Sequence, residues 1–69
     1  MDTVKIGKYI AGKRKALGMT QAQVAEKLGM SDKSVSKWER GLSDPSTTNL
    51  MALAKLFNMT PEDLLKEAL

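Results

Sequence analysis

Lys33, Lys37 and Arg40 recur at spacings of four and three residues within the stretch SDKSVSKWERG, residues 31–41. In a helix, at about 100° per residue, these three cations lie on one side and the apolar residues on the other. Ammonium and guanidinium groups donate hydrogen bonds to phosphates and to guanine O6 and N7, and one helix fits the major groove of DNA. The pattern favours a DNA-reading helix, and an ordinary solvated helix face is the alternative. The apolar side consists of Val35 and Trp38.

Two further polar residues open this stretch. Ser34 lies beside the cations, and its hydroxyl can reach a base edge or a phosphate. Asp32 stands in the first turn, where a DNA phosphate would repel it but the positive end of the helix dipole favours a carboxylate. We favour the dipole role for Asp32, although a carboxylate there can also accept a hydrogen bond from cytosine N4.

Five short helices are predicted to position these residues, and no segment alternates apolar with polar residues as a strand does. Gly18, Gly29 and Gly41 end helices, and residues of the Ser, Thr and Asp type precede their starts. The expected N-caps are Thr20, with Gln23 completing a capping box, then Ser31, Asp44 or Ser46, and Thr60 before Pro61. The expected ranges are about 3–17, 21–28, 32–40, 47–57 and 61–68.

The corner at Gly29 explains why the second and third helices are separate. Glycine adopts a positive φ at little cost, so the chain can turn sharply there. With only residues 29–31 between them, the two helices must cross steeply, which defines a helix-turn-helix over about residues 20–40. Ala25 lies four residues before Gly29, and its small side chain allows a close approach. The residues expected to pack the crossing are Val24, Ala25, Leu28, Met30, Val35 and Trp38.

The remaining helices supply the rest of the predicted core by the same periodicity. An all-α, compact bundle of five short helices, one domain over residues 1–69, is therefore expected. The inward residues outside the crossing are Ile6, Ile10, Leu17, Leu50, Leu53, Ala54, Phe57, Leu64 and Leu65.

Composition excludes several classes of function. The chain has no Cys and no His, so thiol chemistry, an obvious metal site and a proton shuttle near neutral pH are all missing. No glycine-rich phosphate loop or catalytic carboxylate pair is evident, and we expect neither an enzyme nor a cofactor. No apolar run approaches the roughly 20 residues of a membrane span, and no signal peptide opens the chain, which favours a cytoplasmic location.

Charge is unevenly distributed along the chain. Residues 1–41 hold nine Lys and Arg against four Asp and Glu, a net charge of +5, whereas residues 42–69 carry −2. The basic surplus of the first segment suits a polyanionic partner. Lys13, Lys27 and Arg40 are candidate phosphate contacts, while Lys8 and Lys15 are equally consistent with plain surface.

The stretch LGMTQAQVAEKLGMSDKSVSKWERG, residues 17–41, resembles the helix-turn-helix of the Cro and phage-repressor family, which includes the phage 434 and lambda repressors. The likeness extends from IGKYIAGKRKALG to NLMALAKLFNMTPEDLL, nearly the whole chain. It implies a lambda repressor-like DNA-binding domain of bacterial or phage type, acting as a sequence-specific transcriptional regulator, most simply a repressor. The second helix of the motif would read the major groove.

The resemblance also implies roles for particular residues. Gln21 matches a glutamine that contacts the operator backbone and supports the base reader, and Arg40 matches a second backbone contact. Arg14 and Glu39 match a structural ion pair between the first and third helices. The base-reading positions correspond to Asp32, Lys33, Ser34 and Lys37, where Asp32 replaces the glutamine of some relatives and so implies a different operator.

Double-stranded operator DNA, usually palindromic, is the partner that the resemblance implies, bound by a homodimer. Met59, Leu64 and Leu69 are candidates for the dimer surface, or for the core instead. The alternative function is an antitoxin or another protein-interaction module on the same fold, with a toxin as the protein partner. The operator sequence, the regulated genes, an inducer and the direction of regulation are not encoded in a readable pattern.

Overall fold

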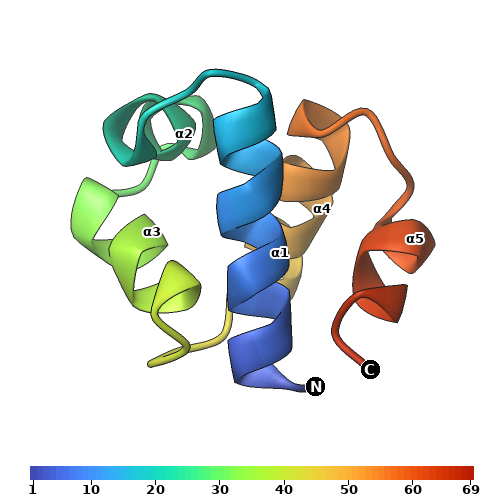
Figure 1. The fold of residues 1–69 in the computed structure, drawn as a ribbon. Helices are drawn as coiled ribbons and strands as arrows, with labels where there is room; N and C mark the ends of the chain where they lie inside the picture. The colour runs from blue at the N-terminus through green and yellow to red at the C-terminus, as the bar shows by residue number, and fades with distance from the viewer.

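Five helices and no strand form the fold in a computed structural model of residues 1–69 (Figure 1). The all-α class and the order of the helices are confirmed. Three helices end one residue earlier than predicted, because the residue after the C-cap has a positive φ and turns the chain away from the helix axis. The residues with this positive φ are Gly18 after α1, Gly41 after α3 and Asn58 after α4. The helices are α1 (Thr3–Ala16), α2 (Gln21–Leu28), α3 (Asp32–Glu39), α4 (Thr47–Leu56) and α5 (Pro61–Lys66).

Each helix begins at a side chain that accepts a hydrogen bond from a backbone N–H three residues later. The predicted caps Thr20, Ser31 and Thr60 are confirmed, and the capping box of Thr20 with Gln23 is complete. Ser46 caps α4, with its Oγ accepting from Asn49 N at 3.2 Å. Asp44 instead accepts a 2.6 Å hydrogen bond from the Thr3 hydroxyl and ties the loop before α4 to α1. The cap of α1, which the sequence reading did not identify, is Asp2.

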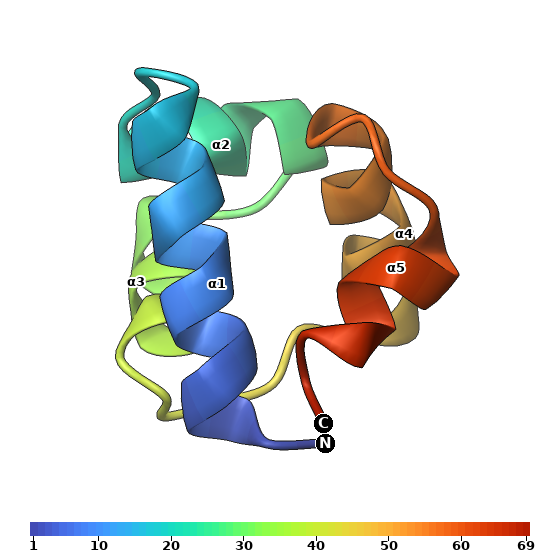
Figure 2. The ribbon, with the colours of Figure 1, turned by 45° about the vertical axis from the view of Figure 1, so that its right-hand side comes forward.

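One apolar core connects all five helices. α1 and α2 pack against α3, and α4 packs against α5 and α2. The two ends of the chain lie side by side (Figure 2), joined by a 2.7 Å hydrogen bond from Asp2 N to Ala68 O. The buried apolar residues are Ile6, Ile10, Val24, Ala25, Val35, Trp38, Leu50, Leu53, Ala54, Phe57, Leu64 and Ala68.

Two glycines set the position of α3. Gly29 ends α2 in the left-handed region, at φ 67°, which confirms the predicted corner between α2 and α3. Gly7 is buried where α1 crosses α3, and a Cβ built on it would lie only 2.0 Å from the Trp38 carbonyl oxygen. No larger residue fits at Gly7 without moving one helix, a role that sequence periodicity did not predict.

Three apolar expectations were wrong, those for Leu17, Met30 and Leu65. Leu17 is 50% exposed, because α1 ends before it and the chain turns away at Gly18. Met30 is 36% exposed at the outer side of the Gly29 corner, and Leu65 is 43% exposed because Leu64 alone points inward from α5. Leu64 is completely buried, so it belongs to the core and not to a dimer surface. No helix here combines the length and apolar character needed to cross a membrane.

Candidate nucleic-acid interface

α3 presents a buried apolar side and an exposed charged side, as its sequence predicts. Val35 is fully buried and Trp38 is 3% exposed, so Trp38 is a core residue and offers no stacking surface. Ser31 caps the helix, and its first-turn carboxylate, Asp32, is exposed at the positive end of the helix dipole. The exposed side chains of the charged side are Asp32, Lys33, Lys37 and Arg40.

Two serines lie at the edges of this surface. Ser34 is half-buried, and its hydroxyl lies 3.2 Å from the Ser31 hydroxyl. The Ser34 hydroxyl is therefore hydrogen-bonded to the residue that caps the N-terminus of α3. Ser36 is also half-buried, and it follows Asp32 and precedes Arg40 by four residues, which places all three on one side of the helix. The same spacing in the sequence would have identified Ser36, which the sequence reading left out. Arg40 folds back along α3 and donates from Nε to the Ser36 carbonyl at 3.3 Å.

A polar clamp holds the end of α3 against α1 and α2. The Arg14 guanidinium donates twice to the Glu39 carboxylate, from Nε at 2.7 Å and from Nη2 at 3.0 Å. A third donor, Nη1, reaches the Met19 carbonyl at 2.9 Å. The Gln21 side-chain amide donates to the same Glu39 carboxylate at 3.0 Å. We call these four residues the clamp; they connect α1, the α1–α2 turn, α2 and α3.

The clamp is largely shielded from water. The Arg14 and Glu39 side chains are only 13% and 7% exposed. The hydrogen bonds that Arg14 donates to Glu39 raise the pKa of Arg14, with burial acting in the opposite direction, so the guanidinium is charged throughout the usual pH range. Because both charges are desolvated and almost fully hydrogen-bonded, each needs the other to remain buried at acceptable cost.

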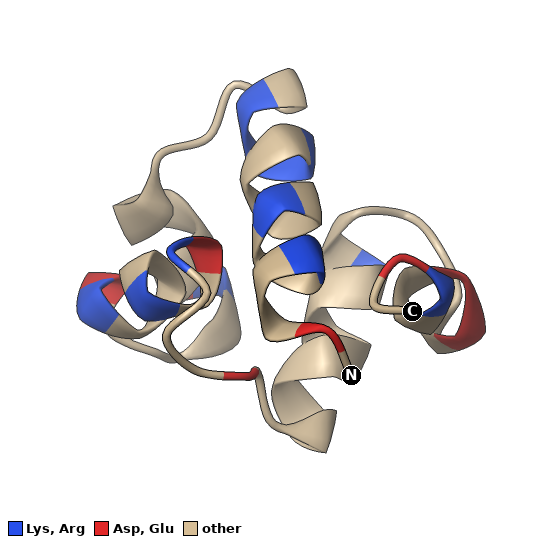
Figure 3. Cartoon of the chain, turned by 60° about the horizontal axis from the view of Figure 1, so that its bottom comes forward, with Lys and Arg blue, Asp and Glu red and all other residues tan.

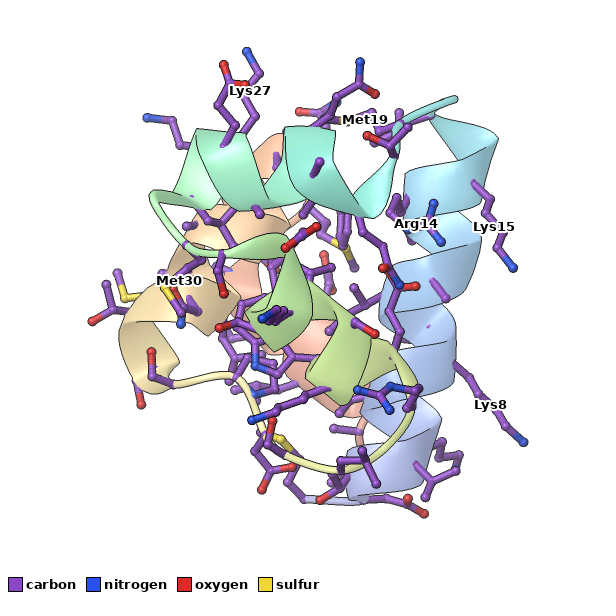
Figure 4. The ribbon with its side chains drawn as sticks, turned by 90° about the vertical axis from the view of Figure 1, so that its left-hand side faces the viewer. Lys8, Arg14, Lys15, Met19, Lys27 and Met30 are labelled. Atoms are coloured by element: carbon purple, nitrogen blue, oxygen red, sulfur yellow. The ribbon has the colours of Figure 1, made fainter.

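The structure places the proposed phosphate contacts at different distances from α3. Gln21 lies at the N-terminus of α2 beside α3, and its side-chain nitrogen already donates one hydrogen bond to Glu39. Lys13 is half-buried and shares the side of α1 that carries Tyr9, which faces Met59. Lys27 projects from α2 away from α3 (Figure 4) and, with Lys55, lines a shallow groove between α2 and α4. Gln21 and Arg40 therefore lie close to the charged side of α3, and Lys13 and Lys27 do not.

Figure 3 shows the charge asymmetry in space. Lys and Arg recur along α1 and α3, and Asp and Glu gather on α5 near the C-terminus. α1 contains no acidic residue, and only Arg14 among its cations forms a salt bridge. Apart from Arg14, the cations of α1 and α3 therefore form no salt bridge.

Residues 10–64 match the model of the helix-turn-helix family, a span that contains α2, the Gly29 corner and α3. The chain belongs to the helix-turn-helix family. Its most similar curated relatives include the repressor protein C2 of Salmonella phage P22, 38% identical over 66 residues, 96% of this chain and 31% of that protein. The regulator DicA of Escherichia coli is 46% identical over 56 residues, 81% of this chain and 42% of that regulator. These relatives confirm the resemblance to phage repressors.

Solved structures of this family have the same fold. The P22 c2 repressor bound to a synthetic operator superposes with a TM-score of 0.83 at 37% identity, covering 90% of this chain and 94% of that chain. The solution structure of the DNA-binding domain of the same repressor gives a TM-score of 0.84 at 38% identity, covering 96% of this chain and 87% of that domain. This helix-turn-helix chain thus spans less than half of the first curated relatives but nearly all of the solved DNA-binding unit.

Proposed function

We propose that this chain is the DNA-binding unit of a sequence-specific transcriptional regulator, most simply a repressor, which reads the major groove with α3. The observation that carries the proposal is the exposed basic side of α3, held in place by the clamp and by the Gly7 crossing. A solvated helix face does not require such exact placement. The proposal is supported by the P22 repressor, whose operator-bound structure has the same fold.

Base and phosphate contacts have separate tasks in this proposal. Lys33 and Lys37 donate to guanine O6 and N7, Ser34 to a base edge or a neighbouring phosphate, and Asp32 accepts from cytosine N4 or only stabilises the helix. Phosphate contacts supply most of the affinity and the salt dependence, and base contacts supply the sequence preference. The proposed phosphate contacts are Gln21, Arg40, Lys13 and Lys27.

A two-fold dimer on a palindromic operator completes the proposal. The domain measures 26 × 24 × 22 Å, less than the roughly 34 Å turn of B-DNA that separates two half-sites. One copy therefore covers a single half-site. For the dimer surface we propose the groove between α4 and α5, which Met51, Met59 and Pro61 help to line, together with Leu69, which is 80% exposed.

The test is selection of bound duplexes from a random library, followed by affinity measurements on the selected sequence. Lys33→Ala with Lys37→Ala should lower affinity at least 100-fold and leave the circular dichroism spectrum and melting temperature nearly unchanged, because both side chains are exposed. The matched control is Lys66→Glu, which lowers the net charge by the same two units at an exposed position on α5, outside the proposed dimer groove. Equal losses in the two variants would show that the cations of α3 act only through the overall charge of the chain.

A second candidate function is that of an antitoxin. The antitoxin PezA of Streptococcus pneumoniae is 36% identical over 62 residues, 90% of this chain and 39% of that protein. Copurification of the chain with a protein partner, unaffected by Lys33→Ala and Lys37→Ala, would favour this candidate. The exposed cations of α3 favour the DNA-binding regulator, since a protein adaptor has no need of them.

A further inference from the structure

The outer side of α1 is a second cationic surface that the proposed reading of the half-site does not use. α1 carries Lys5, Lys8, Lys13, Arg14 and Lys15 and no acidic residue. Lys8, Gly12 and Lys15 are exposed, and at about 100° per residue they share one side of the helix. Figure 4 shows Lys8 and Lys15 extending in the same direction from the side of α1 that faces away from α3, and neither forms a salt bridge. We call these three residues the α1 strip.

Gly12 has no structural reason to be glycine. A Cβ built there would meet nothing within 4 Å, whereas one on Gly7 would meet the backbone of α3. Gly12 also sits inside a helix, where glycine costs about 1 kcal/mol relative to alanine. Because Gly12 has no side chain, nothing protrudes from the helix between Lys8 and Lys15. An extended polyanion can therefore lie close to both ammonium groups.

The spacing of the two lysines suits one strand of DNA. Seven residues of helix rise roughly 10 Å. One strand of B-DNA carries a phosphate about every 3.4 Å along the axis, so Lys8 and Lys15 can each reach a phosphate of the same strand. Small charged metabolites do not need two cations so far apart.

The two sides of α3 differ in charge. On the side of α1 lie Lys8 and Lys15, whereas the chain from Gly41 to Ala54 contains no cation and one acid, Asp44. Figure 4, which faces α3, shows α1 on one side of α3 and the start of α4 on the other, so a dimer joined through α4 places α1 on the outer side of each half-site. DNA that continues outward past α3 therefore meets the α1 strip.

We propose that the α1 strip binds the phosphate backbone of DNA flanking the half-site that α3 reads. This inference rests on the proposed function, and it adds a sequence-independent contact outside the operator. The partner is the flanking duplex of the same DNA molecule.

The test compares two duplexes, one trimmed to the selected half-sites and one with about 12 further base pairs at each end. The wild-type chain should bind the extended duplex about tenfold more tightly, and Lys8→Gln with Lys15→Gln should abolish that advantage without changing affinity for the trimmed duplex. The slope of log affinity against log salt on the extended duplex should decrease by about 3.6, since the dimer loses four phosphate contacts and each contributes about 0.9. The control variant Lys66→Glu, an equal change of charge on α5 and outside the proposed dimer groove, should retain the advantage.

Three results would overturn the inference: equal losses on both duplexes, equal losses in the control variant, or no loss at all. If the Lys8 and Lys15 variant shows no loss of DNA affinity but no longer captures an acidic protein, the α1 strip binds protein and not DNA. Failure of the two proposals is distinguishable. If the wild-type chain binds no duplex, both the proposed function and this inference are wrong. If it binds the trimmed duplex tightly and gains nothing from flanking DNA, only this inference is wrong.

Discussion

The two halves of the chain are held together in different ways. In residues 1–41, α1 and α3 touch backbone to backbone at Gly7, and two hydrogen bonds from Arg14 to Glu39 join their ends. The other two hydrogen bonds of the clamp connect Arg14 to Met19 and Gln21 to Glu39. In residues 42–69, α4 and α5 share apolar contacts, and no side-chain hydrogen bond connects them. The only salt bridge of this half, between Lys66 and Asp63, is exposed, 3.9 Å long and internal to α5.

This difference separates stability from placement. Apolar burial is non-directional and stabilises any well-packed arrangement. A bidentate guanidinium–carboxylate pair and a backbone contact at a glycine are satisfied over a narrow range of positions. The half that presents the charged side of α3 contains these directional contacts, so it is built to hold one helix in a fixed orientation.

Removing Glu39 should have the largest effect. Glu39→Ala leaves the Arg14 charge buried and Gln21 without its partner, and we expect the free energy of unfolding to fall by about 3–5 kcal/mol. Urea unfolding followed by circular dichroism measures this loss. The control is Asp63→Ala, which breaks the exposed pair of α5 and should change stability little. Comparable losses in the two variants would contradict the contrast between the halves.

Adding one methyl group at the α1–α3 crossing should have the next largest effect. Gly7→Ala places a Cβ against the Trp38 carbonyl and should lower the free energy of unfolding by about 3 kcal/mol, since the helices must separate. Gly12→Ala is the matched control on the same helix. It meets no atom and should raise stability by up to about 1 kcal/mol. Thermal melts of the two variants should therefore shift in opposite directions.

Truncation of Leu64 tests the other half. Leu64→Ala removes a fully buried side chain and should lower the free energy of unfolding by about 2–3 kcal/mol. At a temperature where the variant remains folded, its affinity for a trimmed single half-site should equal that of the wild-type chain. A Leu64→Ala variant that stays folded and yet loses half-site affinity would show that α5 also helps to orient α3.

Tyr9 should give the smallest effect, at high pH. Burial, then the carboxylates of Glu67 and Asp63, raise the pKa of Tyr9 above its usual value of about 10. The unfolded chain therefore loses this proton first, and folding stability should decrease as the pH rises above about 10. Tyr9 is the only tyrosine, so absorbance of its phenolate reports the midpoint directly. A midpoint at or below 10 would contradict this, and Tyr9→Phe should remove its share of the pH dependence.

Local chemistry made most of the fold predictable. The caps Thr20, Ser31 and Thr60, the corner at Gly29 and the exposed side of α3 follow from hydrogen bonding and backbone freedom within a few residues. The pairing of Arg14 with Glu39 was implied by the resemblance and not by spacing. Periodicity alone put Leu17, Met30 and Leu65 inside, because it cannot tell where a helix end turns away from the core.

What the sequence by itself determined is therefore where each helix starts, where it stops to within one or two residues, and which side of it is mostly apolar. Only the tertiary structure decided that Gly7 carries the α1–α3 contact while Gly12 does not, and that Gln21 shares Glu39 with Arg14. The physical reason is range: caps and glycine turns act over three or four residues, whereas the Arg14–Glu39 contact joins residues 25 positions apart. A contact of that kind exists only once the chain has folded.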